Sequence, residues 1–241
     1  RNVRDFEFRT TDAAFDYLLC DSCGLVYLHP RPSAAELHRA YPALYDQYAS
    51  ARTPARALSR VLRERLVLAP RMRRALRGLH GARLPRVIEI GCGNAQSLLA
   101  VRSAAPNAEL HGVDIESGQR AWLESRSIVF HEGRFESLPF PAASFDLAIL
   151  NHVIEHMTDP AAVLGKVATI LKPGGVAYVE THVADCLERR VFGRYWIGFD
   201  APRHLCVFTE GTLRRVIEGV GLTVTALERE VSFGDAIYSG R

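Results

Sequence analysis

A glycine turn between an apolar run and an amphipathic segment constrains the fold more than any other feature of this sequence. The stretch RVIEIGCGNAQSLLA, residues 86–100, places Gly91 and Gly93 directly after an apolar run that ends at Ile90. Glycines let the backbone adopt torsions that a Cβ forbids, and they let it approach a ligand closely. A strand, a glycine turn and a helix in this order predict the carboxyl edge of a parallel sheet, where doubly wound folds bind ligands.

Short apolar segments alternate with amphipathic ones along the rest of the chain. This alternation predicts an α/β fold, a doubly wound and mostly parallel sheet with helices on both faces. Asp159 is expected to cap a helix that begins at Pro160 and ends at residues 173–175, and a further helix is expected at 209–220. The expected strands are Val87–Ile90, Glu109–Val113, Ile128–Phe130, Phe145–Leu150 and Val176–Thr181, with a late strand at Leu222–Glu230.

The 241 residues can hold one α/β domain with an appendage but not two full enzyme domains. We expect an N-terminal segment at 1–50, an arginine-rich helical cap at 51–84 in which Pro70 separates two helices, and the main domain at 85–241. No apolar run approaches the length of a membrane span, so no membrane association is expected. The five cysteines are scattered, which favours a reducing compartment, and we expect the cytoplasm.

Arginines are concentrated between positions 52 and 86, where Glu64 is the only acid. The simpler interpretation is a solvated helix face. The alternative is a surface for an anionic partner, such as a phosphate, an acidic carrier protein or RNA. Nucleic acid is the less favoured partner, because no aromatic residues interleave this run.

Four positions around the glycine turn indicate the kind of ligand. Asp114 ends the second strand about twenty residues after the turn, where an acid can accept both ribose hydroxyls. Gln96 occupies the place of the third glycine of a dinucleotide fingerprint. Glu89 would repel a phosphate but suits an amino group, and Ile115 could pack on an adenine face. These features describe an adenosyl ligand without phosphates, such as S-adenosylmethionine.

Four segments together resemble class I S-adenosylmethionine-dependent methyltransferases, most closely the branch that contains the ubiquinone-biosynthesis O-methyltransferases. They are VIEIGCGNAQSLLA, HGVDIE, LPFPAASFDLAILNHVIEHMTDP and ILKPGGVAYVET, and the resemblance covers about residues 86–230. It implies a Rossmann-like fold with a seven-stranded sheet. It also implies methyl transfer to a small-molecule acceptor, most directly O-methylation in the biosynthesis of a secondary metabolite, sugar or quinone-like compound.

The resemblance also implies roles for individual residues. The methionine end of the cofactor would be held by Glu89, Gly91 and Gly93, and the ribose by Asp114. Residues 134–136 would frame the adenine. Many relatives carry an acid where Arg134 stands, so the backbone of Phe135 or the side chain of Glu136 would serve instead, and Asn151 is expected to touch the cofactor.

A hydroxyl acceptor generally needs a base that titrates near neutrality, which makes histidine the first residue type to consider. The segment NHVIEHM offers His152, Glu155 and His156 at spacings that share one helix face, where they could meet a metal or an acceptor. In the ubiquinone branch, acids and a histidine at matching positions are associated with a divalent cation, and His152 here replaces an acid. A structural role for His156, bonded to backbone, is an equal alternative.

The segment at about 182–208 follows the fifth strand and is expected to form the acceptor loop. Tyr195, Trp196 and Phe199 could line an acceptor pocket, or they could simply plug the edge of the sheet. The string WIGFDAPRHL resembles a family segment whose histidine sits near the acceptor. His204 is therefore the favoured base, His156 is the second candidate, and His182 is the third.

Cys20 and Cys23 form half of a zinc ribbon, whose tetrahedral site needs four ligands. A pair upstream of the sequence, or His29 and His38, could complete such a zinc site. The alternative is two ordinary cysteines in a tight turn.

Besides a small-molecule O-methyltransferase, three other functions fit the sequence: an N- or C-methyltransferase, an RNA methyltransferase that uses the arginine run, and a non-catalytic adenosyl-binding partner subunit. The residues leave the acceptor and the oligomeric state open.

Overall fold

The structure is a computed structural model that describes residues 2–6, 8–41, 64–79 and 84–229. The chain divides into two compact units. The first comprises residues 1–43, 154–164 and 181–241, and the second comprises residues 44–153 and 165–180. The boundary crosses helix α6 (Pro160–Ile170). This division differs from the expected segments, because the N-terminal residues share a unit with the C-terminal ones.

The second unit is built on a five-stranded parallel sheet. Its strands are β4 (Arg86–Ile90), β5 (Glu109–Asp114), β6 (Ile128–Glu132), β7 (Phe145–Asn151) and β8 (Leu171–Glu180), in the order β6-β5-β4-β7-β8. Within this sheet the first strand, β4, is central, the next two strands lead to one edge, and β7 and β8 lead to the other edge. In such folds the ligand crevice lies at the carboxyl ends of the strands where this reversal occurs. Here those strands are β4 and β7, which pair in register from Val87 with Leu147 to Ile90 with Leu150.

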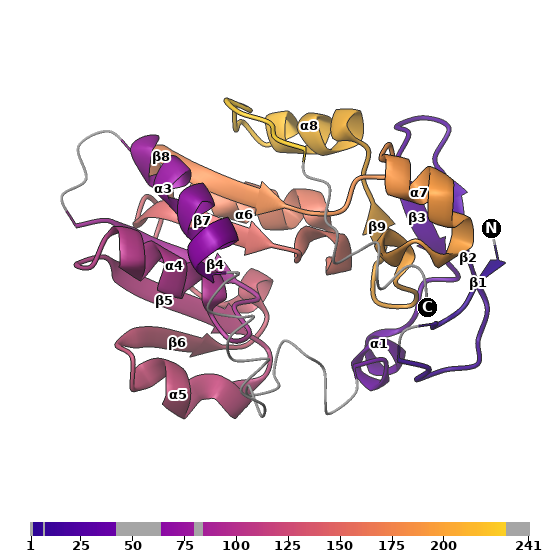
Figure 1. Cartoon of the computed structure of the whole chain (residues 1–241), viewed down its shortest axis with the longest axis horizontal. Helices are drawn as coiled ribbons and strands as arrows, with labels where there is room; N and C mark the ends of the chain where they lie inside the picture. The colour runs from indigo at the N-terminus through magenta and orange to yellow at the C-terminus, as the bar shows by residue number, and fades with distance from the viewer. Residues whose placement is uncertain (1, 7, 42–63, 80–83, 230–241) are drawn as a thin grey trace. The chain divides into compact units, whose positions relative to one another are not determined.

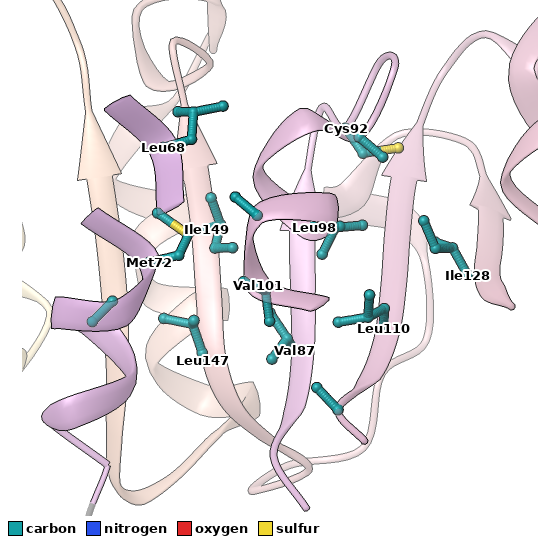
Figure 2. Close-up of a cluster of buried hydrophobic side chains, with 14 of the residues drawn as sticks. Leu68, Met72, Val87, Cys92, Leu98, Val101, Leu110, Ile128, Leu147 and Ile149 are labelled. Atoms are coloured by element: carbon teal, nitrogen blue, oxygen red, sulfur yellow. The ribbon is translucent and has the colours of Figure 1, made fainter. Parts of the chain in front are cut away.

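Helices of the second unit begin with a π-helical turn (Glu64–Leu68), followed by α3 (Ala69–Arg77), α4 (Gln96–Ala104) and α5 (Arg120–Glu124). Short 3₁₀ turns lie at Ser117–Gln119 and Phe135–Ser137. The apolar sides of α3 and α4 pack on one face of the sheet (Figures 1 and 2). Buried residues of this core include Leu68, Met72, Val87, Leu98, Val101, Leu110, Ile128, Leu147 and Ile149 (Figure 2). This packing fixes the glycine turn between β4 and α4.

The first unit contains a separate four-stranded antiparallel sheet. Its strands β1 (Asn2–Val3), β2 (Phe15–Leu19), β3 (Val26–His29) and β9 (Cys206–Val207) lie in that order. Its helices are α1 (Ala34–Arg39), α7 (Leu187–Phe192) and α8 (Glu210–Gly219). The 3₁₀ turns of this unit lie at Ile154–His156, Gly193–Tyr195 and Ile197–Phe199. Pairing of β3 with β9 joins the N-terminal segment to the segment after residue 181 within this unit.

Most predicted elements are confirmed. The five strands expected between residues 87 and 181 all form, and α8 begins after Thr209, which accepts a hydrogen bond from Thr212 N. Asp159 accepts from Ala162 N at 2.9 Å and so caps α6, which begins at Pro160 as expected. Pro70 lies in the first turn of α3, which directly follows the π-helical turn Glu64–Leu68, so Pro70 does not separate two helices as expected. The part of the expected upstream helix before residue 64 lies outside the described residues.

Three expectations about the sheet are wrong. The parallel sheet has five strands among the described residues rather than seven, and the other strands form the antiparallel sheet. Residues 222–229 form no strand, although their composition suits one. Residues 173–175 do not end α6, which already ends at Ile170. They instead form an irregularity within β8, where the register shifts between Phe145 and Leu147. Separately, no described helix is long and apolar enough to cross a membrane.

Candidate functional site

The glycine turn lies at the carboxyl end of β4, at the reversal point of the parallel sheet. Gly91 and Gly93 both have positive φ, +64° and +46°, which side chains rarely adopt. A Cβ added to Gly91 would also lie 2.6 Å from Cγ2 of Val153, well inside van der Waals contact. Both the torsion and the space therefore require glycine at position 91, as the sequence predicts.

Glu89 is a buried acid next to this turn. Its side chain is only 4% exposed, and it faces the hydroxyl of Ser97 and the backbone of Leu98. Among the residues that the structure describes, its Oε2 atom has no hydrogen-bond partner. Burial, with a smaller contribution from the charge of Asp114, raises the pKa of Glu89 to about 8. The free protein therefore holds a carboxyl group that a cationic ligand would ionise.

Asp114 ends the neighbouring strand β5 and is tied to the glycine turn. One carboxylate oxygen accepts from Gly93 N at 2.8 Å, and the other accepts from Glu116 N at 3.2 Å. A carboxylate can accept about four hydrogen bonds, so this arrangement is compatible with additional ribose hydroxyls. The next residue, Ile115, is a large apolar side chain that is 54% exposed, as expected of a surface on which an adenine could pack.

Asn151 supplies a second buried acceptor at the same edge of the sheet. It ends β7, the strand beside β4, and its Nδ2 donates to Ser97 Oγ at 3.1 Å. Its Oδ1 is buried and has no hydrogen-bond partner within the described part of the chain. Ser97 thus contacts both Glu89 and Asn151, and each of these two side chains keeps one buried oxygen to which no described residue donates. Buried acceptors without donors are costly, so this edge is suited to a ligand that carries N–H groups.

The predicted adenine segment follows β6. The ring of Phe135 is 2% exposed and lies 5.8 Å from the ring of Phe140, so it belongs to the interior and could offer a ligand only its backbone. The carboxylate of Glu136 lies 3.4 Å from Arg134, on a more exposed part of this turn.

His152 takes part in a network that the sequence analysis missed. Its backbone has φ +52°, and its N–H donates to the carbonyl of Glu180 at 2.9 Å. The Glu180 carboxylate accepts hydrogen bonds from the guanidinium of Arg71 and from the hydroxyl of Tyr178, each at 2.5 Å. Nε2 of His152 lies 3.5 Å from the same carboxylate. Burial would raise the pKa of Glu180, but these three neighbours lower it to about 2. Glu180 is therefore ionised, and Arg71 is an internal partner rather than part of a solvated arginine face.

The expected shared helix face of His152, Glu155 and His156 does not form. The 3₁₀ turn begins at Ile154, and His152 precedes it with a left-handed backbone. His152 also belongs to the second unit, whereas Glu155 and His156 belong to the first.

Within the first unit, His204 takes the place expected for His152. One ligand atom from each of Glu155, His156 and His204 lies within 4.8 Å of the others, close enough to hold a metal ion. The Nδ1 atoms of both histidines lie 3.1 Å from backbone carbonyls, of Arg203 for His156 and of Gly198 for His204. Because a carbonyl can only accept, this geometry favours the proton on Nδ1 of His204 and leaves its Nε2 as the ligand or base atom. Nδ1 of His156 also lies 3.1 Å from the hydroxyl of Tyr41, which can either donate to it or accept from it.

His204 is buried in this group. Burial, followed by the nearby His156, lowers the pKa of His204 to about 3. The imidazole is therefore neutral at physiological pH, and it accepts a proton weakly compared with a base that titrates near neutrality. Its role as the base stays a prediction. The ring of His182 lies 5.6 Å from that of His204 and 6.1 Å from that of Trp196.

A buried ionic cluster holds the loop that carries His204. The guanidinium of Arg203 is fully buried and donates to both oxygens of Asp5, at 2.7 and 3.2 Å, to Asp200 and to the carbonyl of Ala40. Burial would raise the pKa of Asp5, but hydrogen bonds from Arg203 and Thr10 lower it to about 2. One guanidinium thus holds both carboxylates and a backbone carbonyl through hydrogen bonds, which is the pattern of a scaffold.

The three aromatic residues of the loop separate into two groups. Trp196 and Phe199 are buried and contact each other edge to face at 5.1 Å, and Tyr17 stacks on Phe199 at 4.6 Å. They form part of the core of the first unit, and their expected contact with an acceptor stays a prediction. Tyr195 is 51% exposed and remains available to an acceptor.

Cys20 and Cys23 lie in the turn between β2 and β3. The thiol of Cys20 is 3.1 Å from Ser22 Oγ, and hydrogen bonds with Ser22 and Cys23 lower its pKa to about 7. Among the described side chains, neither cysteine belongs to a group of three residues close enough to hold a metal. His29 and His38 therefore do not complete a zinc site, and zinc binding stays a prediction that depends on ligands from elsewhere.

Comparisons with known proteins agree with this arrangement. A family model described as a methyltransferase domain matches residues 45–227, which is more than half of the chain. The ubiquinone biosynthesis O-methyltransferase of Bradyrhizobium sp. (strain ORS 278) is 33% identical over 102 residues, covering 40% of this chain and 39% of the relative. The demethylmenaquinone methyltransferase of Chlorobaculum parvum is 28% identical over 109 residues, covering 44% and 45%.

The chain thus spans less than half the length of these curated relatives. A solved S-adenosylmethionine-dependent methyltransferase from Archaeoglobus fulgidus shares the fold, with a TM-score of 0.53 and 21% identity over 70% of this chain and 74% of that one. With the matched family model, the parallel sheet and the glycine turn at its reversal point, the chain belongs to the methyltransferase-domain family.

Proposed function

We propose that the protein binds S-adenosylmethionine and transfers its methyl group to an oxygen of a small-molecule acceptor. The observation that carries this proposal is the pair of buried acceptors, Glu89 Oε2 and Asn151 Oδ1, beside a turn that requires glycine. An ammonium group supplies the missing donors and a positive charge for Glu89. Asp114, fixed to the same turn, suits the hydroxyls of a ribose.

The bound cofactor would supply an electrophilic methyl group. The protein would bind the cofactor and the acceptor, align them and deprotonate the acceptor. Glu89 would hold the amino group and Asp114 the ribose. Asn151 would direct its free oxygen toward a donor of the ligand. Among the base candidates, His204 offers Nε2 because its Nδ1 faces the carbonyl of Gly198, while His156 is the second candidate and His182 is the third. Tyr195 is the exposed aromatic residue of the loop for contact with an acceptor.

A divalent cation is a further element of the proposal. Glu155, His156 and His204 fit such an ion, because two imidazoles and a carboxylate suit transition metals better than magnesium. If these residues hold an ion, His204 is a ligand and the acceptor proton passes to another group. The names of several relatives support oxygen as the acceptor atom, since they include ubiquinone biosynthesis and malonyl-[acyl-carrier protein] O-methyltransferases.

Two measurements test the proposed function. Calorimetry of the purified chain with S-adenosylmethionine should show one-site binding, and absence of binding would refute the proposal. Incubation with cell extract and methyl-labelled S-adenosylmethionine should then label a low-molecular-weight product that alkaline or acid hydrolysis identifies as an ether or ester. Label recovered on RNA instead would identify the arginine-rich alternative, and tight binding without any labelled product would indicate a non-catalytic subunit.

A further inference from the structure

Lys166 makes an unusual set of contacts for a residue outside the predicted site. It is one of only two lysines in the chain. Its ammonium donates to three backbone carbonyls of the segment after β6: those of Phe135 at 2.6 Å, Glu136 at 3.0 Å and Leu138 at 2.5 Å. An ammonium has three N–H donors, so these carbonyls use all of them. Lys166 thus fixes the backbone of one turn rather than pairing with an acid.

These contacts determine where the other side of the turn points. A peptide unit is planar and trans, so its C=O and N–H point in opposite directions. Because Lys166 holds the carbonyl of Phe135, the N–H of Glu136 must face away from Lys166. The next amide, Ser137 N, donates to Arg134 O at 3.0 Å and closes the 3₁₀ turn. The turn therefore presents the Glu136 amide on the side opposite Lys166.

The same turn is connected to the predicted ribose acid. Strand β6 pairs with β5, and Asp114 lies opposite Glu132 at the carboxyl end of this pair. Gly133 N, directly before the turn, donates to the carbonyl of Asp114 at 2.8 Å. The segment 133–138 is thus held at Asp114 by one bond and at Lys166 by three. A ribose at Asp114 would place its base near this segment.

We propose that Lys166 is a positioning residue for the adenine of the cofactor: it orients the Phe135–Ser137 turn so that a backbone N–H meets the acceptor nitrogen N1 of the base. This inference rests on the proposed function. It adds a specificity that the proposed function does not require. Adenine N1 accepts a hydrogen bond, whereas hypoxanthine carries a hydrogen at N1 and would oppose the amide donor. The site should therefore distinguish adenosyl from inosyl ligands.

The test compares Lys166→Met with Lys172→Met, the only other lysine, which is partly exposed and pairs with Asp146 at 2.8 Å. Calorimetry is carried out with S-adenosylhomocysteine and S-inosylhomocysteine. The wild type and Lys172→Met should prefer the adenosyl ligand at least about tenfold, the effect of one opposed hydrogen bond. Lys166→Met should bind the adenosyl ligand about tenfold more weakly and lose most of the preference.

The ratio of the two affinities separates positioning from folding. A general loss of structure in Lys166→Met would weaken both ligands equally and leave the ratio unchanged, which would overturn the inference. An unchanged affinity and ratio would overturn it as well. If the wild type binds neither ligand, the proposed function itself fails. In a sample labelled with ¹⁵N at the lysine Nζ, the Lys166 ammonium should give a signal that exchanges slowly with solvent and shifts when S-adenosylhomocysteine binds. A Lys166 signal that exchanges as fast as that of Lys172 would contradict the three bonds.

Discussion

Replacing Glu89 by glutamine should stabilise the free protein and weaken its binding of S-adenosylmethionine. The pKa of Glu89 rises from 4.5 to about 8 because the carboxyl group is buried. Between these two values the unfolded chain carries the charge and the folded chain does not. This group therefore favours folding most below pH 4.5, and that advantage is lost as the pH rises toward 8. At pH 7 the free energy of unfolding is lower by ~3 kcal/mol on this account, because each pH unit above 4.5 removes about 1.4 kcal/mol.

Glutamine has nearly the same shape and does not ionise, so it removes this cost. Without ligand, Glu89→Gln should melt roughly 8–16 °C above the wild type at pH 7.5, where the loss is ~4 kcal/mol, because 1 kcal/mol shifts the melting temperature of a chain of this size by about 2–4 °C. At pH 4.5 the two proteins should melt within about 2 °C of each other. Glu124→Gln, a change of an exposed acid on α5, is the matched control and should leave both melting temperatures nearly unchanged.

The same substitution removes the charge that the amino group of the cofactor would meet. A charge-assisted hydrogen bond contributes about 1.5–3 kcal/mol, so the affinity for S-adenosylmethionine should fall roughly tenfold to a hundredfold. Wild-type binding at pH 6.5 should also release a proton, visible as a binding enthalpy that depends on the buffer, and Glu89→Gln should lose this release. Equal melting of mutant and wild type at pH 7.5 would show that Glu89 is already ionised in the free protein. Stabilisation with undiminished affinity would place the amino group elsewhere.

Three other substitutions test the remaining parts of the argument. Asp114→Ala should weaken S-adenosylmethionine binding about tenfold to a hundredfold in calorimetry with little change in the folded state, and unchanged affinity would refute its role at the ribose. Arg203→Ala leaves two buried aspartates without their cation and should lower the free energy of unfolding in urea by about 3–5 kcal/mol. A decrease of less than about 1 kcal/mol would contradict this reasoning. His204→Ala should lower turnover at least about a hundredfold with cofactor affinity unchanged if His204 is the base; an increase in acceptor KM alone would make it a positioning residue.

The elements around the glycine turn could be predicted because their signals are local. An apolar run followed by Gly91 and Gly93 already describes a strand and a turn, and the positive φ values confirm why glycine stands there. The cap at Asp159 is equally local, since the bond it makes spans only three residues. The antiparallel sheet could not be predicted in this way. Strands of two residues, such as β1 and β9, show no periodicity, and they form only because β2 and β3 provide partners.

Roles that depend on partners far apart in the sequence could not be predicted. Trp196 and Phe199 suit a pocket wall or a core equally well, and the stacking of Tyr17 on Phe199 places them in the core. The network around Glu180 joins residues as far apart as 71 and 180, so no spacing along the chain could indicate it. The role of Lys166 could not be predicted for a different reason: its ammonium donates to backbone carbonyls, which every residue carries whatever its side chain.

Two buried acids show how structure separates a scaffold from a site. Asp5 and Glu89 are both buried, but Arg203 and Thr10 lower the pKa of Asp5 to about 2 against the effect of burial, while burial raises the pKa of Glu89 to about 8. Asp5 therefore stabilises the fold above its ordinary pKa of 3.8, and this stability is lost as the pH falls toward 2. Glu89 acts in the opposite direction above pH 4.5, so these two groups together favour the free protein most near pH 4–5. A ligand that brings a cation to Glu89 would do for it what Arg203 does for Asp5, and would thereby extend the range of greatest stability toward neutral pH.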